Sequence, residues 1–268
     1  MNMRENVKSD FNKYMKINKI AWDKRTPVHV KSKFYDNKKF KKDLNSLKEI
    51  ELNAIGNIKG KSLLHLQCHF GQDSISLANM GADVTAVDFS NIAIQEAKKI
   101  SKDNDIPINF VESNVLKLKL NKKFDIIFSS YGVIGWLPDL NKWAQVISTH
   151  LKKGGLFLLT EFHPFINLIA NNKCDYFYNK KPDIEIKKGS YTDGGKKIKT
   201  KTCWWNHSLT SIFSALESQK LKLTLFEEFN YCPFPLEGMI KKEKGKYLLE
   251  SRKKQNLPYV FNLKATKK

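Results

Sequence analysis

The sequence predicts an α/β fold in which helices cover both faces of a doubly wound, mostly parallel sheet. Apolar segments alternate with segments of helical periodicity. Segments such as FDIIFS and LFLLTE are apolar on both faces, as buried parallel strands are. Gly154 and Gly155 mark a helix-to-strand turn. The expected strands are 62–67, 83–88, 107–111, 124–130 and 155–161, with helices at 72–80, 90–103 and 139–152.

The segments on either side of this alternation are less regular. Residues 1–20 and 37–56 have the spacing of apolar residues that predicts helices. Residues 162–206 are rich in aromatic residues, Asn, Lys and Gly, and we interpret them as an insertion over the strand ends, where open α/β sheets bind ligands. The expected C-terminal elements are a helix at 208–219 and strands at 221–229 and 258–265.

Composition narrows the class of protein. Of the 268 residues, 41% are hydrophobic and 12% aromatic, which supports a sizeable core and excludes the composition of a disordered chain. No apolar run is long enough for a transmembrane helix, and the N-terminus lacks the apolar centre of a secretion signal. The cysteines Cys68, Cys174, Cys203 and Cys232 are widely spaced, which favours reduced thiols. We therefore expect a cytoplasmic protein with no membrane partner.

The formal net charge of +20 suggests nucleic acid as a possible partner. Against this, Arg4, Arg25 and Arg252 are the only arginines, whereas nucleic-acid sites usually recruit arginine for bidentate contacts. The lysines are scattered, and the high Lys, Asn and Ile content is typical of A/T-rich codons. A small-molecule partner is favoured, with nucleic acid kept as an alternative and no prediction of oligomeric state.

The stretch from Leu63 to Ser90, LLHLQCHFGQDSISLANMGADVTAVDFS, carries the strongest functional signal. It predicts a buried strand, a turn at Gly71, a short helix closed by Gly81, and a second strand that ends in Asp88. This order places a backbone turn and a helix N-terminus beside a carboxylate. A nucleotide-like ligand binds across such geometry, with its ribose hydroxyls on the acid.

Over about residues 60–162 the sequence resembles the class I S-adenosylmethionine-dependent methyltransferases. Members share an acid-Leu-Gly-Cys-Gly-any-Gly turn, for which this chain has HLQCHFG, so that His65 replaces the acid and Gln67 and His69 replace two glycines. The continuations GADVTAVDFSNIAIQEAKK and FDIIFSSYGVIGWLPDLNKWAQVISTHLKKGGLFLLTE also match. The HLQCHFGQD form is similar to a subgroup of small-molecule methyltransferases.

The resemblance implies S-adenosyl-L-methionine as cofactor and a Rossmann-like, doubly wound, mostly parallel seven-stranded sheet with N-terminal helices and an insertion after strand 5. Asp88 would bind the ribose, Phe89 would cover the adenine, and Gln67 would substitute for the missing acid through its carbonyl oxygen. The implied cofactor-binding residues are Gln67, His69, Phe70, Gly71, Asp88, Phe89, Asn114, Val115, Ser130 and Tyr131. The single domain, 1–268, would divide into an N-terminal cap or lid (1–58), a cofactor-binding core (59–162), a substrate-side insertion (163–206) and the C-terminal part of the sheet (207–268).

Candidate catalytic and substrate-binding residues come from the strand ends, the insertion and the N-terminus. The catalytic candidates are His163, His207 and Tyr131, and the substrate-binding candidates are Trp22, Arg25, His29, Trp136, His163 and Trp205. Each has a structural alternative: His163 as a cap, the tryptophans as core residues, and the N-terminal group as a packed helix. His65, Cys68 and His69 lack the spacing of a metal site, so no metal is expected.

The leading functional prediction is S-adenosylmethionine-dependent methyl transfer to a small-molecule acceptor. A nicotinamide-dependent reductase is the first alternative, but it needs a G-x-G-x-x-G turn, and QCHFGQD contains one glycine. An RNA-directed methyltransferase or RNA-binding protein is the second alternative, and a catalytically silent cofactor-binding domain is the third. The sequence does not distinguish O, N, S or C as the acceptor atom.

Overall fold

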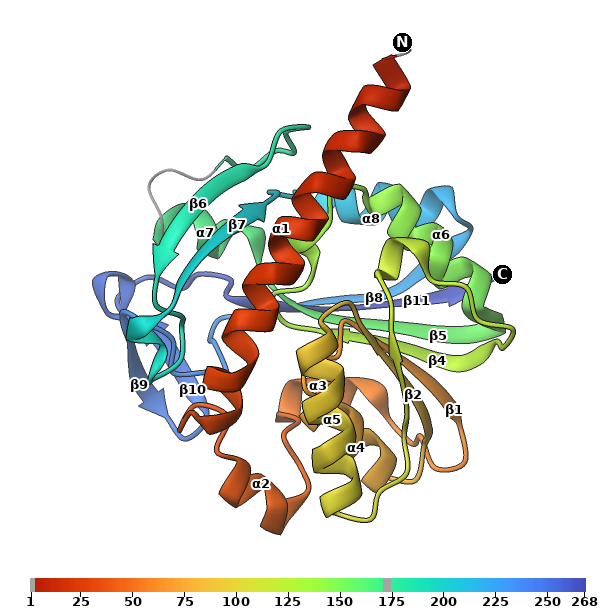
Figure 1. The fold of residues 1–268 in the computed structure, drawn as a ribbon, viewed down its shortest axis with the longest axis horizontal. Coiled ribbons are helices and arrows are strands. Elements are labelled where there is room, and N and C mark those ends of the chain that lie inside the picture. Colours follow the sequence, from red (N-terminus) through yellow and green to blue (C-terminus); the bar gives the residue numbers. More distant parts are fainter. Residues whose placement is uncertain (1–2, 171–174) are drawn as a thin grey trace.

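The computed structural model describes residues 3–170 and 175–268, and a seven-stranded sheet of order β3-β2-β1-β4-β5-β11-β8 lies at its centre (Figure 1). The five strands from β3 to β5 are parallel, whereas β11 runs antiparallel to both β5 and β8. This confirms the predicted fold class. The strands are β1 (Ser62–Leu66), β2 (Asp83–Asp88), β3 (Asn109–Glu112), β4 (Phe124–Ser130), β5 (Leu151–Phe162), β8 (Leu221–Phe229) and β11 (Val260–Lys267).

Helices cover both faces of this sheet (Figure 1). Side chains alternate between the faces along each strand. Phe157 of β5 therefore packs into a core that includes Trp143, and its neighbour Leu158 packs into a second core that includes Phe128. One face is covered by α3 (Glu49–Ile55), α4 (Gln72–Asn79) and α5 (Asn91–Asp103), and the other by α6 (Leu140–His150) and α8 (Leu209–Ser218).

The N-terminal helices differ from the prediction. The helix expected at 1–20 continues to residue 31 as α1 (Met3–Lys31), and the helix expected at 37–56 is divided into α2 (Asn37–Asp43) and α3. Leu44 ends α2 in the left-handed conformation, with φ of 46°. Ser46 is then held by α4, because its N–H donates to Ser76 Oγ at 2.9 Å. This tertiary contact leaves no trace in the spacing of apolar residues, so the sequence did not predict the break between the two helices.

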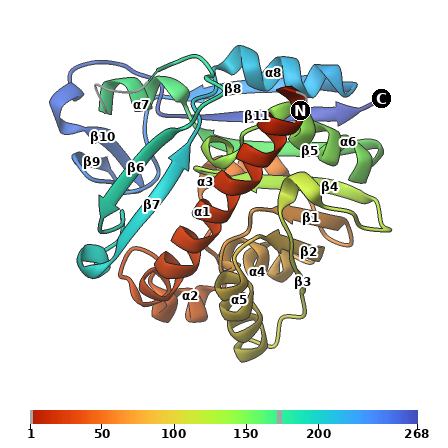
Figure 2. The same cartoon turned by 45° about the horizontal axis from the view of Figure 1, so that its top comes forward.

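Two hairpins gather at the edge where the parallel strands end (Figure 2). The first, within the predicted insertion, pairs β6 (Asp183–Lys188) with β7 (Lys199–Trp204). Helix α1 packs against β7, where Asn18 exchanges two hydrogen bonds of 2.8 Å with the Cys203 backbone. The second hairpin, β9 (Met239–Glu243) with β10 (Lys246–Leu249), was not predicted.

The remaining short elements are α7 (Pro164–Ala170) and four 3-10 turns: η1 (Val115–Lys117), η2 (Ile134–Trp136), η3 (Gly195–Lys197) and η4 (Glu250–Arg252). In residues 3–170 and 175–268, no helix has both the length and the apolarity needed to cross a membrane.

Candidate active site

The turn after β1 has a backbone suited to glycine, although two of its positions hold larger residues. Gln67, His69 and Gly71 all have positive φ, at 58°, 51° and 81°. The left-handed region costs a non-glycine residue about 1–2 kcal/mol. At Gly71 a side chain would be strained and crowded, since a Cβ would lie only 3.0 Å from Ala97 Cβ and from the Phe110 ring. Non-glycine residues held in this region cluster at functional sites, where surrounding contacts maintain them.

Side-chain bonds hold Gln67 and His69 in this conformation. Gln67 Nε2 donates to the Val133 carbonyl at 2.9 Å, and its Oε1 is buried without a partner. His69 Nε2 lies 3.0 Å from Nδ1 of His29 on α1, and His29 Nε2 lies 2.6 Å from Ser190 Oγ in the β6–β7 connection. Burial lowers the pKa of His29 to about 3 and the pKa of His69 well below its usual value. A neutral histidine pair therefore connects the turn, α1 and the insertion.

Asp88 closes the turn from the end of β2. Its Oδ2 accepts the His69 N–H at 2.9 Å, and its Oδ1 accepts the Ser90 N–H at 2.8 Å. The side chain is 8% exposed, and burial raises its pKa to about 6 against the opposing effect of these N–H donors. Each carboxylate oxygen has a further lone pair. Asp88 can therefore still accept hydrogen bonds from a ligand.

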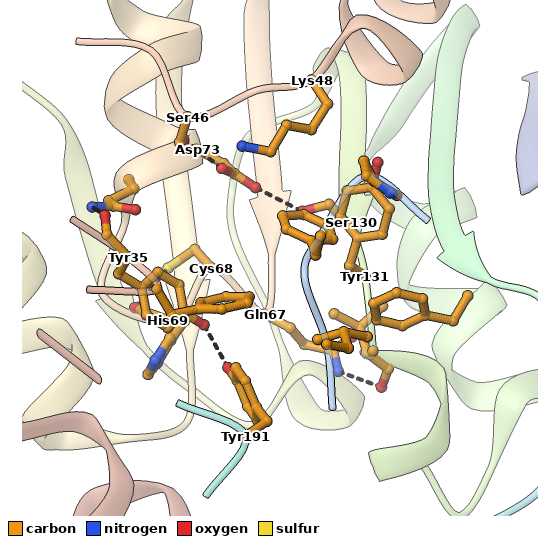
Figure 3. A pocket seen from close by; sticks show the side chains of 18 of the residues that line it. Tyr35, Ser46, Lys48, Gln67, Cys68, His69, Asp73, Ser130, Tyr131 and Tyr191 are labelled. Atoms are coloured by element: carbon orange, nitrogen blue, oxygen red, sulfur yellow. Dashed lines mark hydrogen bonds between the residues drawn. The ribbon is translucent and has the colours of Figure 1, made fainter. Parts of the chain in front are cut away.

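A cavity of about 960 Å³ lies over this turn and the ends of β2 and β4. This volume is at the upper end for small-molecule sites, which span about 300–1,000 Å³. Side chains of the β1 turn and the β4 end point into it, with Tyr191 of the insertion opposite (Figure 3). The cavity is therefore enclosed by the sheet edge on one side and by α1 and the hairpins on the other.

The turn after β4 forms another wall of the cavity. Tyr131 has a φ of 38°, and its hydroxyl donates to Glu51 Oε2 of α3 at 2.8 Å. The Glu161 carboxylate accepts the N–H groups of Gly132, Val133 and Ile134, so Glu161 anchors this turn. Both Glu51 and Tyr131 line the cavity. Burial, reinforced by repulsion from Asp73, raises the pKa of Glu51 to about 8.

Asp73, in the first turn of α4, joins three elements around the same wall. Its Oδ1 accepts the Ser46 hydroxyl at 2.6 Å, and its Oδ2 accepts the Ser130 hydroxyl at 2.9 Å. Figure 3 shows the Lys48 ammonium directed toward this carboxylate. Asp73, Lys48 and Ser46 line the cavity, and they were not among the predicted site residues. The only sequence signal was the acid two residues after Gly71, at the start of a helix.

Comparison with known proteins agrees with this geometry. Residues 63–155 match the family model described as a methyltransferase domain. The structure is similar to an S-adenosylmethionine-dependent methyltransferase from Clostridium acetobutylicum, with a TM-score of 0.58 and 16% identity over 93% of this chain and 98% of that one. Residues 63–155 of this chain are a methyltransferase domain, and the chain has the fold of a solved S-adenosylmethionine-dependent methyltransferase.

Another solved structure and two curated proteins are also similar to this chain. The glycopeptide N-methyltransferase MtfA in complex with S-adenosyl-L-methionine has a TM-score of 0.54 and 15% identity, with 81% of this chain and 90% of that one covered. The ubiquinone biosynthesis O-methyltransferase of Rickettsia canadensis is 24% identical over 162 residues, which are 57% of this chain and 62% of the relative. The Pelagibacter ubique protein of the same name is 27% identical over 160 residues. The chain thus spans less than two thirds of these curated relatives.

The methyltransferase domain places most of the predicted cofactor residues at the cavity. Asp88 and Gln67 offer acceptors suited to the ribose hydroxyls and the amino group of S-adenosylmethionine, and the buried, unpartnered Gln67 Oε1 is the atom that most needs such a donor. The predicted residues that line the cavity are Gln67, His69, Phe70, Gly71, Asp88, Phe89, Val115, Ser130, Tyr131, Trp22, Arg25 and Trp136.

Asn114 is an exception among the predicted cofactor residues. Its side chain caps η1, because Oδ1 accepts the Leu116 N–H at 2.9 Å, and it lies outside the cavity lining. The residues on either side, Ser113 and Val115, line the cavity instead. An Asn that begins a 3-10 turn satisfies a local N–H first, so the structure gives the Asn114 side chain a capping role.

Two predicted catalytic histidines lie outside the cavity lining. His163 Nδ1 accepts the Phe165 N–H at 3.1 Å and its Nε2 lies 2.9 Å from the Glu228 carboxylate, so it caps α7. His207 Nε2 lies 2.8 Å from the Leu137 carbonyl and its ring stacks on Tyr178. Both rings are buried by packing behind the strand ends. The structure therefore does not bring these two histidines to the cavity, where a base or a substrate contact was expected.

One residue predicted from the insertion and one from the N-terminal segment also lie outside the cavity lining. Trp205, the residue after β7, is buried against Tyr14 of α1, and its neighbour Trp204 lines the cavity instead. His29 is outside the cavity lining and acts through its bond to His69. No cluster of three or more metal-ligating side chains occurs in the described part of the chain.

Proposed function

We propose that this protein transfers the methyl group of S-adenosylmethionine to a small-molecule acceptor. The observation that carries the proposal is the cavity itself. One wall has the strained turn and Asp88 that suit the cofactor, and about 960 Å³ leaves room for a second small molecule. The O-methyltransferase names of the curated relatives support a small-molecule acceptor. Three buried, free cysteines, Cys68, Cys203 and Cys232, support a reducing, cytoplasmic location.

The cofactor, when bound, supplies a methyl group already activated on a sulfonium. The protein's contributions are therefore positioning and the exclusion of water. Asp88 accepts from the ribose hydroxyls, and Gln67 Oε1 and the Asp73 carboxylate accept from the amino group. The rings of Trp22 and Trp136, 5.3 Å apart, cover the opposite side of the cavity and keep water out.

A proton must leave the acceptor when its nucleophile is a hydroxyl or a protonated amine. Of the predicted catalytic residues, only Tyr131 faces the cavity, and it is bonded to Glu51. Burial raises the pKa of Tyr131 well above 10, so the phenol stays protonated at neutral pH. Glu51, with a pKa raised to about 8, is the group that can accept the proton, directly or through the Tyr131 hydroxyl. This pair replaces the histidines as our candidate base.

Calorimetric titration of the full chain with S-adenosylmethionine, its demethylated product S-adenosylhomocysteine, and NADH tests the proposal. We expect micromolar dissociation constants for the two sulfur compounds, about −8 kcal/mol, and no heat from NADH. Asp88→Ala should weaken both by about ten- to a hundredfold, because hydrogen bonds to a charged group contribute about 1.5–3 kcal/mol. Asp83→Ala, at the exposed start of the same strand, is the matched control. Absence of binding by the unmodified chain would refute the proposed function.

A further inference from the structure

Arg25 is a buried cation at the wall of the cavity. It lies on α1, the residue is 6% exposed, and it lines the cavity. Its Nη2 donates to Thr200 Oγ1 of β7 at 3.1 Å, whereas Nε is buried without a partner. Among the side chains that the structure describes, no carboxylate forms an ion pair with Arg25. Among the described residues, the bond to Thr200 is therefore the one hydrogen bond given for a guanidinium that carries five N–H donors.

The groups around Arg25 do not supply the missing negative charge. Glu185 of β6 attracts it only at longer range and is exposed. Tyr191 is a neutral phenol at physiological pH, since burial raises its pKa to about 12. Lys187, which also lines the cavity, adds positive charge. A buried guanidinium in such surroundings destabilises the protein unless an anion binds beside it.

The rings around Arg25 indicate the shape of that ligand. The guanidinium carbon lies 5.7 Å from the ring centres of both Trp22 and Trp136, which hold it by cation–π contacts. Trp204 packs edge-to-face on Trp136 at 5.1 Å and also faces the cavity. Flat aromatic walls beside a fixed planar fork of donors suit a flat molecule that ends in a carboxylate.

We propose that the methyl acceptor is a planar small molecule with a carboxylate that Arg25 binds. This inference rests on the proposed methyl transfer and names the substrate class of that site. The cofactor also has a carboxylate, but Lys48 and Asp73 provide the paired charges for its amino-acid end on the α3–α4 side. Arg25 belongs to the opposite side, where α1 meets the β7 strand of the insertion.

Benzoate and benzamide are suitable probes, because they share a shape and differ in charge. Their affinities for the full chain saturated with S-adenosylhomocysteine would be measured by ligand-observed NMR. We expect benzoate to bind at least tenfold more tightly than benzamide. Arg25→Met should abolish this preference, and Arg25→Lys should retain part of it. Arg252→Met, at an exposed arginine of η4, should leave it unchanged.

Two further measurements separate the alternatives. The melting temperature of Arg25→Met should be no lower than that of the unmodified protein, because the variant removes a buried charge that forms no ion pair. A large drop in melting temperature together with an unchanged benzoate preference would show that Arg25 is structural, and would overturn the proposal. Equal binding of the two probes, or binding of neither, would also overturn it.

Titration with S-adenosylhomocysteine keeps this inference separate from the proposed function. The affinity of Arg25→Met for this compound should match that of the unmodified protein. If it falls more than tenfold, Arg25 binds the carboxylate of the cofactor, and the acceptor assignment is wrong while the proposed methyl transfer stands. If the unmodified protein itself does not bind the compound, the proposed function fails, and the acceptor assignment fails with it.

Discussion

Replacement of Gln67 by glycine and by alanine tests whether the β1 turn holds a left-handed residue. Both changes remove the bond to the Val133 carbonyl, a loss of about 1 kcal/mol. Alanine keeps the strain of the positive φ, so Gln67→Ala should destabilise the protein by about 1 kcal/mol. Glycine relieves about 1–2 kcal/mol of strain but adds about 0.4–1 kcal/mol of chain entropy in the unfolded state. Gln67→Gly should therefore be close to the unmodified protein, and about 1 kcal/mol more stable than Gln67→Ala.

Urea unfolding followed by tryptophan fluorescence measures this difference from the transition midpoints. The control is the same pair of changes at Gln95, which is exposed within α5. There the alanine variant should be the more stable of the two, because alanine stabilises a helix interior relative to glycine by about 1 kcal/mol. Both Gln67 variants should also bind S-adenosylhomocysteine more weakly, since each lacks the buried Oε1. If Gln67→Ala proves as stable as Gln67→Gly, the turn is not left-handed at this residue and the argument from strain is wrong.

Two further predictions concern the wall formed by α3 and α4. Asp73→Asn should weaken binding of S-adenosylhomocysteine by about tenfold or more, because a charged acceptor contributes about 1.5–3 kcal/mol. Asp103→Asn, at an exposed residue of α5, is the control. An unchanged calorimetric affinity of the Asp73 variant would mean that the amino group of the compound binds elsewhere. Burial raises the pKa of Glu51 from 4.5 to about 8, so unfolding releases its proton between these values and stability should fall as pH rises from about 4.5 to 8. Glu51→Gln should flatten that fall in urea midpoints and remove any rise in methyl-transfer rate toward pH 8, and an unaltered pH dependence would contradict the raised pKa.

The sheet was predictable because its signal is local. The segment expected at 221–229 is β8 to the residue, and the segment expected at 83–88 is β2, because alternating or apolar runs between turn residues are a local signal of a strand. The β9–β10 hairpin was missed because its strands are only five and four residues long and β9 carries two adjacent lysines. Its apolar residues become buried only through tertiary contacts with the cluster around Tyr259. The break at Leu44 depends on contacts with α4, which no window of sequence contains.

The site was predictable only where topology determines it. Strand ends meet at one edge of a parallel sheet, so Asp88 and Ser130 could be placed together from the order of elements. His163 also follows a strand end, but its ring turns back to cap α7, and that direction depends on the Glu228 contact from β8. Glu51 lies on a helix whose orientation the sequence does not specify. Site residues that lie on helices or in insertions therefore cannot be placed without the tertiary structure.

The glycines missing from the turn have a physical consequence beyond cofactor contact. A glycine at position 69 would adopt the same backbone without strain, but it would have no side chain to reach α1. His69 instead bonds to His29, which bonds to Ser190, so the cofactor turn, the N-terminal helix and the insertion share one chain of hydrogen bonds. Because burial keeps both imidazoles neutral, this connection persists through the neutral pH range. The strain at the turn is thus maintained by contacts that also place the covering elements over the cavity.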